Sequence, residues 1–170
     1  HTRILAAEGH HLDWLIGRVP ERAAAFAQEH GYARHSTRLE DALLAEALGA
    51  FALGFVLVPG SRRRIAPEAA RAIGEALGPF VVRVGVFRNQ PPEAVLRLME
   101  EARLQVAQLH GEEPPEWAEA VGRFYPVIKA FPLEGPARPE WADYPAQALL
   151  LDGKRPGSGE AYPRAWAKPL

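Results

Sequence analysis

The chain has 170 residues, of which 48% are apolar and 24% are charged, as is ordinary for one soluble globular domain with a real core. Its formal net charge of −1 gives no overall field favouring nucleic acid or an anionic membrane, and no apolar run approaches the roughly 20 residues that span a bilayer. The absence of cysteine excludes disulfides, thiolate metal ligands and a cysteine nucleophile, and it is compatible with a cytoplasmic protein.

The first part of the chain carries weak structural signals. We expect the end of a helix over residues 2–8, a strand over 12–17, an alanine-rich helix over 20–29 and a short strand over 31–35. Thr37 and Glu40 then have the spacing of a capping box, in which each side chain bonds the other's backbone N–H. This box predicts a helix over residues 39–48.

From residue 50 onward, short apolar runs alternate with helical segments. Strands are predicted over residues 50–58, 80–87, 106–110, 126–131 and 148–152. Helices are predicted over residues 67–77, 92–104 and 115–124, with a weaker one over 139–144. Runs that are apolar on both faces and alternate with helices indicate a parallel α/β sheet covered by helices. A doubly wound sheet and a (βα) barrel both fit, and because no GxGxxG motif follows a strand, the barrel-like fold is favoured.

Sites in parallel α/β folds lie at the carboxyl ends of strands, where the loops converge. Asp152 ends the last predicted strand after three leucines, and partly apolar surroundings of this kind suit a general acid. Its alternative role is to cap the following turn. His110 ends the strand over 106–110, and it is either a site residue or a hydrogen-bonded structural histidine.

Basic residues supply the other candidates. Arg62, Arg63 and Arg64 follow the strand over 50–58 and could bind a carboxylate or a phosphate, although a solvated loop is the commoner explanation for any single one of them. Lys129 lies within a strand. Glycine-rich residues 153–159 do not match a phosphate-binding loop, and a mobile loop is the default there.

Histidines gather in the first part of the chain, at positions 10, 11, 30 and 35. They form no pair spaced to share one side of a convincing helix, and the nearby carboxylates are not arranged as ligands. We therefore predict no metal site and no cofactor.

Several short segments, in this order and at this spacing, resemble the phosphoribosylanthranilate isomerase family of tryptophan biosynthesis. They are Thr37-Arg38-Leu39-Glu40-Asp41-Ala42, Gly54-Phe55-Val56, Pro59-Gly60-Ser61-Arg62-Arg63, Gln108-Leu109-His110-Gly111, Leu151-Asp152-Gly153 and Gly157-Ser158-Gly159. The resemblance covers about four-fifths of the chain, from Thr37 onward. It implies a (βα)8 barrel that needs no cofactor and that converts N-(5-phosphoribosyl)anthranilate, a small phosphosugar substrate, into its 1-deoxyribulose isomer by an Amadori rearrangement.

The resemblance also implies roles for single residues. Asp152 matches the acid that protonates the furanose ring oxygen, and Arg63 matches the arginine that holds the anthranilate carboxylate. His110 matches a histidine at the mouth of the family's fourth strand. We expect it to be a substrate-binding residue, although the resemblance leaves its exact role open.

Two departures from the family pattern bear on activity. Arg34 stands where the family has the cysteine that acts as the base, and a guanidinium cannot accept a proton. The resemblance reaches only the sixth strand of the family before Leu170. The family's seventh and eighth strands, whose loops bind the substrate phosphate, are missing from the match. We therefore expect an incomplete TIM-type barrel, impaired turnover and self-association through open sheet edges.

Residues 1–35 resemble a different family. The stretch over 12–23 is similar to the second strand and helix of a glucose–fructose-oxidoreductase-type Rossmann domain. We therefore expect a fragment or a chimera of two α/β proteins, with a Rossmann-like segment over 1–35 and a barrel region over 36–170 in one structural domain. An NAD(P)-dependent oxidoreductase fragment and a non-catalytic recombined α/β protein are the alternative readings.

Overall fold

The computed structural model describes residues 3–5, 14–16, 34–36, 39–47, 49–153, 164–167 and 170, with backbone alone for the three short N-terminal strands. Outside the described residues lie the predicted helix over 20–29, the glycine-rich loop beyond 153, Thr37 of the capping box, and His10, His11 and His30. The side chains of Arg34, His35 and Glu40 are also not described.

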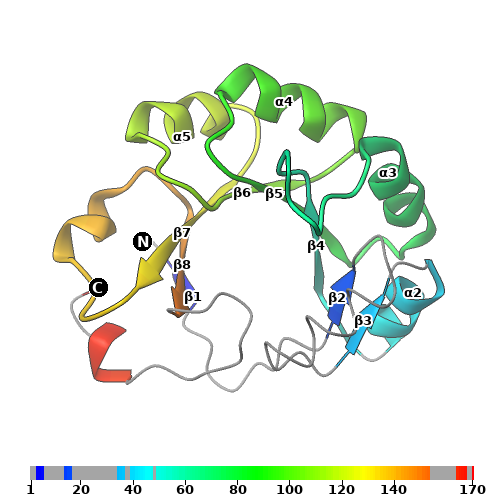
Figure 1. The fold of residues 1–170 in the computed structure, drawn as a ribbon, viewed down its shortest axis with the longest axis horizontal. Coiled ribbons are helices and arrows are strands. Elements are labelled where there is room, and N and C mark those ends of the chain that lie inside the picture. Colours follow the sequence, from blue (N-terminus) through cyan, green and yellow to red (C-terminus); the bar gives the residue numbers. More distant parts are fainter. Residues whose placement is uncertain are drawn as a thin grey trace.

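A six-stranded parallel sheet organises the described part of the chain, and it has the order β1-β8-β7-β6-β5-β4. Its strands are β1 (Arg3–Leu5), β4 (Ala52–Val56), β5 (Val82–Phe87), β6 (Val106–Leu109), β7 (Val127–Leu133) and β8 (Ala148–Gly153). From β4 to β8 each strand pairs with the next along the chain, and the sheet curves into an arc with the helices along its outer side (Figure 1). The predicted parallel, barrel-like α/β fold is confirmed.

β1 corrects one prediction from the sequence. Residues 2–8 were expected to end a helix, but Arg3–Leu5 forms a strand that pairs with Ala148–Leu150 of β8. A three-residue apolar segment carries no periodicity that separates helix from strand. The exposed backbone groups of the β8 edge decide its conformation instead, because each pairing satisfies hydrogen-bonding groups on both strands.

The strands β2 (Trp14–Ile16) and β3 (Arg34–Ser36) form a separate parallel pair. β2 lies within the strand predicted over 12–17, and β3 overlaps the end of the strand predicted over 31–35. The described strands thus form two sheets rather than one closed ring. The expectation of an incomplete barrel is confirmed, with β4 and β1 at the two edges of the larger sheet.

The helices follow the sequence prediction closely. They are α2 (Leu39–Ala47), α3 (Pro67–Ala76), α4 (Pro92–Glu101) and α5 (Pro115–Gly122), with 3-10 turns η1 (Pro139–Asp143) and η2 (Arg164–Ala167). α3, α4 and α5 each begin with proline, whose fixed φ suits a first helical turn and whose missing N–H costs nothing there. The weak helix predicted over 139–144 is a 3-10 turn.

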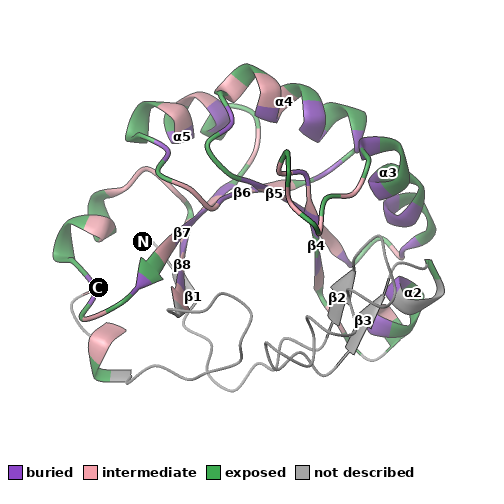
Figure 2. Cartoon of the chain, in the orientation of Figure 1, coloured by how far each residue is buried: buried purple, intermediate pink, exposed green. Residues whose placement is uncertain are grey.

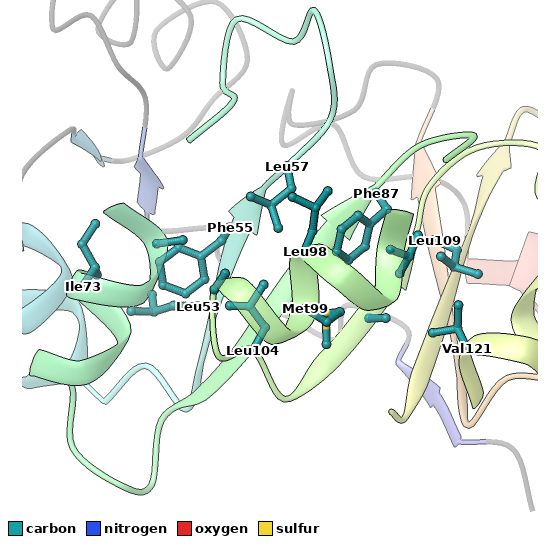
Figure 3. Close-up of a cluster of buried hydrophobic side chains, with 14 of the residues drawn as sticks. Leu53, Phe55, Leu57, Ile73, Phe87, Leu98, Met99, Leu104, Leu109 and Val121 are labelled. Atoms are coloured by element: carbon teal, nitrogen blue, oxygen red, sulfur yellow. The ribbon is translucent and has the colours of Figure 1, made fainter. Parts of the chain in front are cut away.

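The main core lies between the sheet and the helices that cover it (Figure 3). Alternate residues of each strand point to this side, so Phe55 of β4 and Phe87 of β5 are buried there, in one cluster with Met99 of α4. The other side of the sheet faces the concave side of the arc. Several residues on that side, such as Val86 and Gln108, are only half-buried (Figure 2). This difference is what an unclosed barrel produces.

Among the described helices, none combines the length and apolar character that crossing a membrane requires.

Phe55 and Phe80 provide a matched test of where the core lies, because they are 2% and 91% exposed. Phe55→Ala is expected to lower the free energy of unfolding by about 3–5 kcal/mol, through lost burial and the cavity left behind. Phe80→Ala should change it by less than about 0.5 kcal/mol, as surface substitutions usually do. Urea denaturation followed by circular dichroism measures both. Equal losses of unfolding free energy for the two variants would mean that Phe55 does not lie in the core.

Candidate active site

Every strand of the larger sheet runs in the same direction, so the loops after β4, β5, β6, β7 and β8 all leave from one edge. His110 directly follows β6, and Asp152 is the next-to-last residue of β8. Arg63 lies in the loop after β4. The three site residues predicted from sequence therefore share the carboxyl edge of the sheet, where parallel α/β folds build their sites.

His110 and Asp152 are brought into direct contact. The distance between His110 Nε2 and Asp152 Oδ2 is 3.1 Å, and the two side chains are 31% and 20% exposed. β7 lies between the strands that carry them. In a curved parallel sheet, side chains from alternate strands point into the same interior layer, which explains how the contact crosses a strand. The two residues can exchange a proton and still reach solvent or a small molecule.

Gln108 fixes the orientation of the imidazole. It lies two residues before His110, on the same side of β6, and its Nε2 is 3.2 Å from His110 Nδ1. An amide nitrogen donates and cannot accept, so Nδ1 is the acceptor and the neutral ring carries its proton on Nε2. His110 Nε2–H then donates to the Asp152 carboxylate. Gln108 was part of the family resemblance, but its role was not foreseen.

Arg63 lies at the same edge but farther along it. β5 separates its strand from β6, so the structure places Arg63 two strands from His110. Its backbone N–H donates to Ser61 Oγ at 3.2 Å, and Gly60 adopts a φ of +75°, which shapes the turn. The Arg63 residue is half-buried, whereas Arg62 and Arg64 are exposed. This difference singles out Arg63 from the triple arginine.

A buried ion pair lies beside the His110 loop. Lys129 Nζ is 2.7 Å from Glu113 Oε2, and the two side chains are only 3% and 1% exposed. Lys129 also lies over the rings of Phe131 and Tyr144, with Nζ 5.4 and 5.7 Å from the ring centroids. The sequence pointed to Lys129 but missed Glu113. A lysine inside an apolar strand signals that a buried anion is needed, but it does not say which one.

The environment of the pair keeps Glu113 ionised. Burial alone raises the pKa of Glu113, but hydrogen bonds from Lys129 and from the Asn89 backbone, with the charge of Lys129, outweigh it and leave the pKa below its usual value. Burial, followed by the charges of Glu113 and Glu116, raises the pKa of Tyr144, so its hydroxyl stays protonated and donates to Glu113 O at 3.0 Å.

Two further features carry no chemistry of this kind. Within the part of the chain that the structure describes, no three acidic or histidine side chains gather where they could hold a metal ion. A surface depression of about 450 Å³ lies on α3 and α4, lined by Glu68, Arg71, Ala72, Glu75 and Glu101. It lies on the helical layer, and its Arg71–Glu75 ion pair is about half-exposed. The strand ends remain the better site.

Comparison with known proteins decides the family. The model of the N-(5'-phosphoribosyl)anthranilate isomerase family matches residues 33–164, which include all three predicted site residues. The chain belongs to this family. The isomerase of Deinococcus radiodurans is 41% identical over 140 residues, a match that covers 78% of this chain and 65% of that protein. The chain thus spans less than two-thirds of this relative.

Solved structures of family members agree. The crystal structure of phosphoribosyl anthranilate isomerase from Thermus thermophilus is 98% identical, with a TM-score of 0.75, over 79% of this chain and 67% of that one. Another isomerase structure, solved with reduced 1-(o-carboxyphenylamino)-1-deoxyribulose 5-phosphate, is 42% identical with a TM-score of 0.63, over 69% of this chain and 61% of that one. These likenesses confirm a TIM-barrel-type sheet.

The low pKa of Glu113 predicts a pH dependence that a variant can isolate. Because the folded-state pKa lies below the usual 4.5, ionised Glu113 stabilises the fold fully above about pH 4.5, and this stabilisation is lost as pH falls through the folded-state pKa. Glu113→Gln should therefore be less stable than the parent at pH 7, and the difference should narrow below pH 4.5.

Denaturant titrations between pH 7 and pH 3 measure that difference. Glu119→Gln, at an exposed position on α5, is the control and should run parallel to the parent. A stability difference for Glu113→Gln that stays constant across this range would contradict the ionised, paired carboxylate.

Proposed function

We propose that the described site carries the chemistry of the family, the isomerisation of N-(5'-phosphoribosyl)anthranilate to its 1-deoxyribulose form. The observation that supports this most is the 3.1 Å contact of His110 with Asp152 at the carboxyl edge of a family-matched sheet. The reaction is an internal redox exchange between two carbons and needs no cofactor. A relative has been solved with a reduced form of the deoxyribulose phosphate compound, which supports a phosphosugar as the substrate class.

Asp152, paired with His110, is the proposed acid. The pair gives a proton to the furanose ring oxygen, the bond from that oxygen to C1 breaks, and the nitrogen lone pair forms the Schiff base. His110 Nε2 lies 3.1 Å from Asp152 Oδ2, so we take the pair as the unit that holds the proton and passes it to the ring oxygen. A base then removes the C2 proton, and the enolamine relaxes to the ketone.

Arg63 is proposed to bind the anthranilate carboxylate. A guanidinium presents two parallel N–H groups that fit a carboxylate, and Arg63 lies at the same edge of the sheet as the acid. This role holds the aromatic end of the substrate two strands away from the ring oxygen that Asp152 protonates.

Turnover by the chain itself is proposed to be low. The base of the family is a cysteine, and the chain has none. Arg34, in β3, occupies that place by the sequence match and stays protonated. Ring opening can still occur at the acid, but removal of the C2 proton lacks its usual acceptor.

The N-terminal residues are proposed to come from a different source. The family match begins at residue 33, which supports an isomerase region that starts near Ser36. The proposal of a Rossmann-like source for the residues before it rests on the sequence resemblance alone. We propose that the two pack as one domain, because β1 extends the isomerase sheet beside β8. NAD(P) binding by such a segment is the alternative function, and a cofactor titration tests it.

The location and assembly of the chain are also proposals. A biosynthetic isomerase acting on a charged phosphosugar fits the cytoplasm. β4 and β1 are the edges of the larger sheet, and unpaired edge groups favour association with another copy of the chain.

Restoring the base gives the direct test of the proposed function. Arg34→Cys should raise the rate of isomerisation by about 10²–10⁴-fold, the range that a positioned acid or base contributes. In that background, Asp152→Asn should abolish most of the gain while leaving the fold intact. Fluorescence turnover of phosphoribosylanthranilate measures both. No gain from Arg34→Cys, or a gain that Asp152→Asn leaves unchanged, would reject the assignment.

Substrate binding by Arg63 is tested by comparing its replacement with that of the neighbouring Arg62. Arg63→Met in the Arg34→Cys background should raise KM by roughly 10–100-fold, since hydrogen bonds to charged groups contribute about 1.5–3 kcal/mol. Arg62→Met removes an equal charge from an exposed position and should change KM little. Steady-state kinetics measures both variants. Equal effects would mean that general charge attraction, rather than a specific contact, binds the substrate.

A further inference from the structure

One residue, Gly111, links the buried ion pair to the His110–Asp152 contact. Glu113 Oε2 accepts the Gly111 N–H at 2.9 Å, and Lys129 Nζ donates to the Gly111 carbonyl oxygen at 2.5 Å. The pair therefore holds both polar backbone groups of the residue that follows His110. On the other side, the His110 N–H donates to Phe87 O at 2.8 Å. The backbone on both sides of the imidazole is fixed.

The loop after β5 closes the same network. Glu113 Oε1 accepts the Asn89 N–H at 2.9 Å, and Asn89 Oδ1 accepts the Glu112 N–H at 2.7 Å. A Cβ at Gly111 would lie 2.9 Å from the Asn89 backbone nitrogen, so the two loops approach too closely for any other residue there. Asn89 itself has a φ of +53°, a conformation that needs such support.

Stability alone does not account for a pair of this kind. Removing two charges from water costs several kcal/mol each, and apolar side chains of similar volume are often as stable. What apolar residues cannot do is hold a peptide group by its N–H and its C=O together. The orientation of Gly111, and with it the exit of His110 from β6, depends on the two charges.

We propose that Lys129 and Glu113 are positioning residues, which hold Gly111 so that His110 keeps Nε2 on Asp152. Neither touches the Asp152 carboxylate in the contacts described, and both act through the loop that they clamp. We call Lys129 and Glu113, with the Gly111 backbone that they hold, the clamp. Its role in catalysis rests on the proposed function, but its effect on the position of His110 does not.

Nitrogen NMR of the imidazole provides the test. In ¹⁵N-labelled protein, long-range ¹H–¹⁵N spectra distinguish a ring with its proton on Nε2 from a ring that exchanges between tautomers. His110→Gln identifies the signal by its loss. The parent should show the Nε2–H form for His110, and Lys129→Met should shift both nitrogens toward averaged values. Arg97→Met, which breaks the exposed Arg97–Glu101 pair at 3.0 Å, is the matched control and should leave His110 unchanged.

A Lys129→Met protein that is folded by circular dichroism and keeps the parent's His110 spectrum would overturn the proposal. Because that variant can fail to fold, hydrogen exchange of the parent gives an independent measurement. The Gly111 amide lies in a loop, yet the clamp predicts protection far above that of Gly135, another loop glycine, at which a Cβ would have no heavy atom within 4 Å. Equal, fast exchange at Gly111 and Gly135 would also overturn it.

Kinetics separates this proposal from the proposed function. In the Arg34→Cys background, Lys129→Met should lower kcat by about 10²-fold with a smaller change in KM, because the acid is misplaced while the Arg63 contact is retained. If no variant isomerises the substrate but the NMR and exchange results are as expected, the clamp stands and the proposed function fails. An unchanged kcat in an active background would reject the catalytic meaning of the clamp.

Discussion

Lys129 reaches from β7 to the loop that follows β6, where its ammonium group and the Glu113 carboxylate lie 2.7 Å apart in the protein interior. Each charge offsets the desolvation cost of the other, and their remaining hydrogen bonds go to the backbone of Gly111 and Asn89. A pair on the helix-covered side of the sheet thereby fixes two loops at its carboxyl edge. The position of His110 follows from that constraint.

The parallel sheet supplies the other half of the site. Because all its strands run one way, Arg63, His110 and Asp152 leave from one edge, and the curvature brings residues of alternate strands into contact. The proposed roles follow from these positions. In the proposed function, a proton moves where His110 meets Asp152, and Arg63 holds a carboxylate of the substrate two strands away. Relatives that share this sheet are isomerases of one phosphosugar substrate class.

The sequence predicted the regular elements well and the interactions between them poorly. Apolar runs, proline-headed helices and, for α2, the spacing of a capping box located the elements between residues 39 and 153, because local periodicity and helix-start signals determine them. The helix end predicted over residues 2–8 was wrong, because the strand β1 forms by pairing with β8, which is a tertiary contact. Glu113 was missed for the same reason: a loop glutamate becomes the partner of Lys129 only when β6 and β7 are adjacent. Asp152 and His110 were expected near each other, but Gln108 as the group that sets the tautomer was not.

The central claim is that Lys129 and Glu113 act as one unit in holding the site loop. A double-mutant cycle tests it most directly, using the free energies of unfolding of the parent, Lys129→Met, Glu113→Gln and the double variant. Breaking a buried pair from one side leaves an uncompensated charge, so each single change should be costly and the double change should cost less than their sum, by roughly 1–3 kcal/mol. Costs that add to within about 0.3 kcal/mol would contradict the claim.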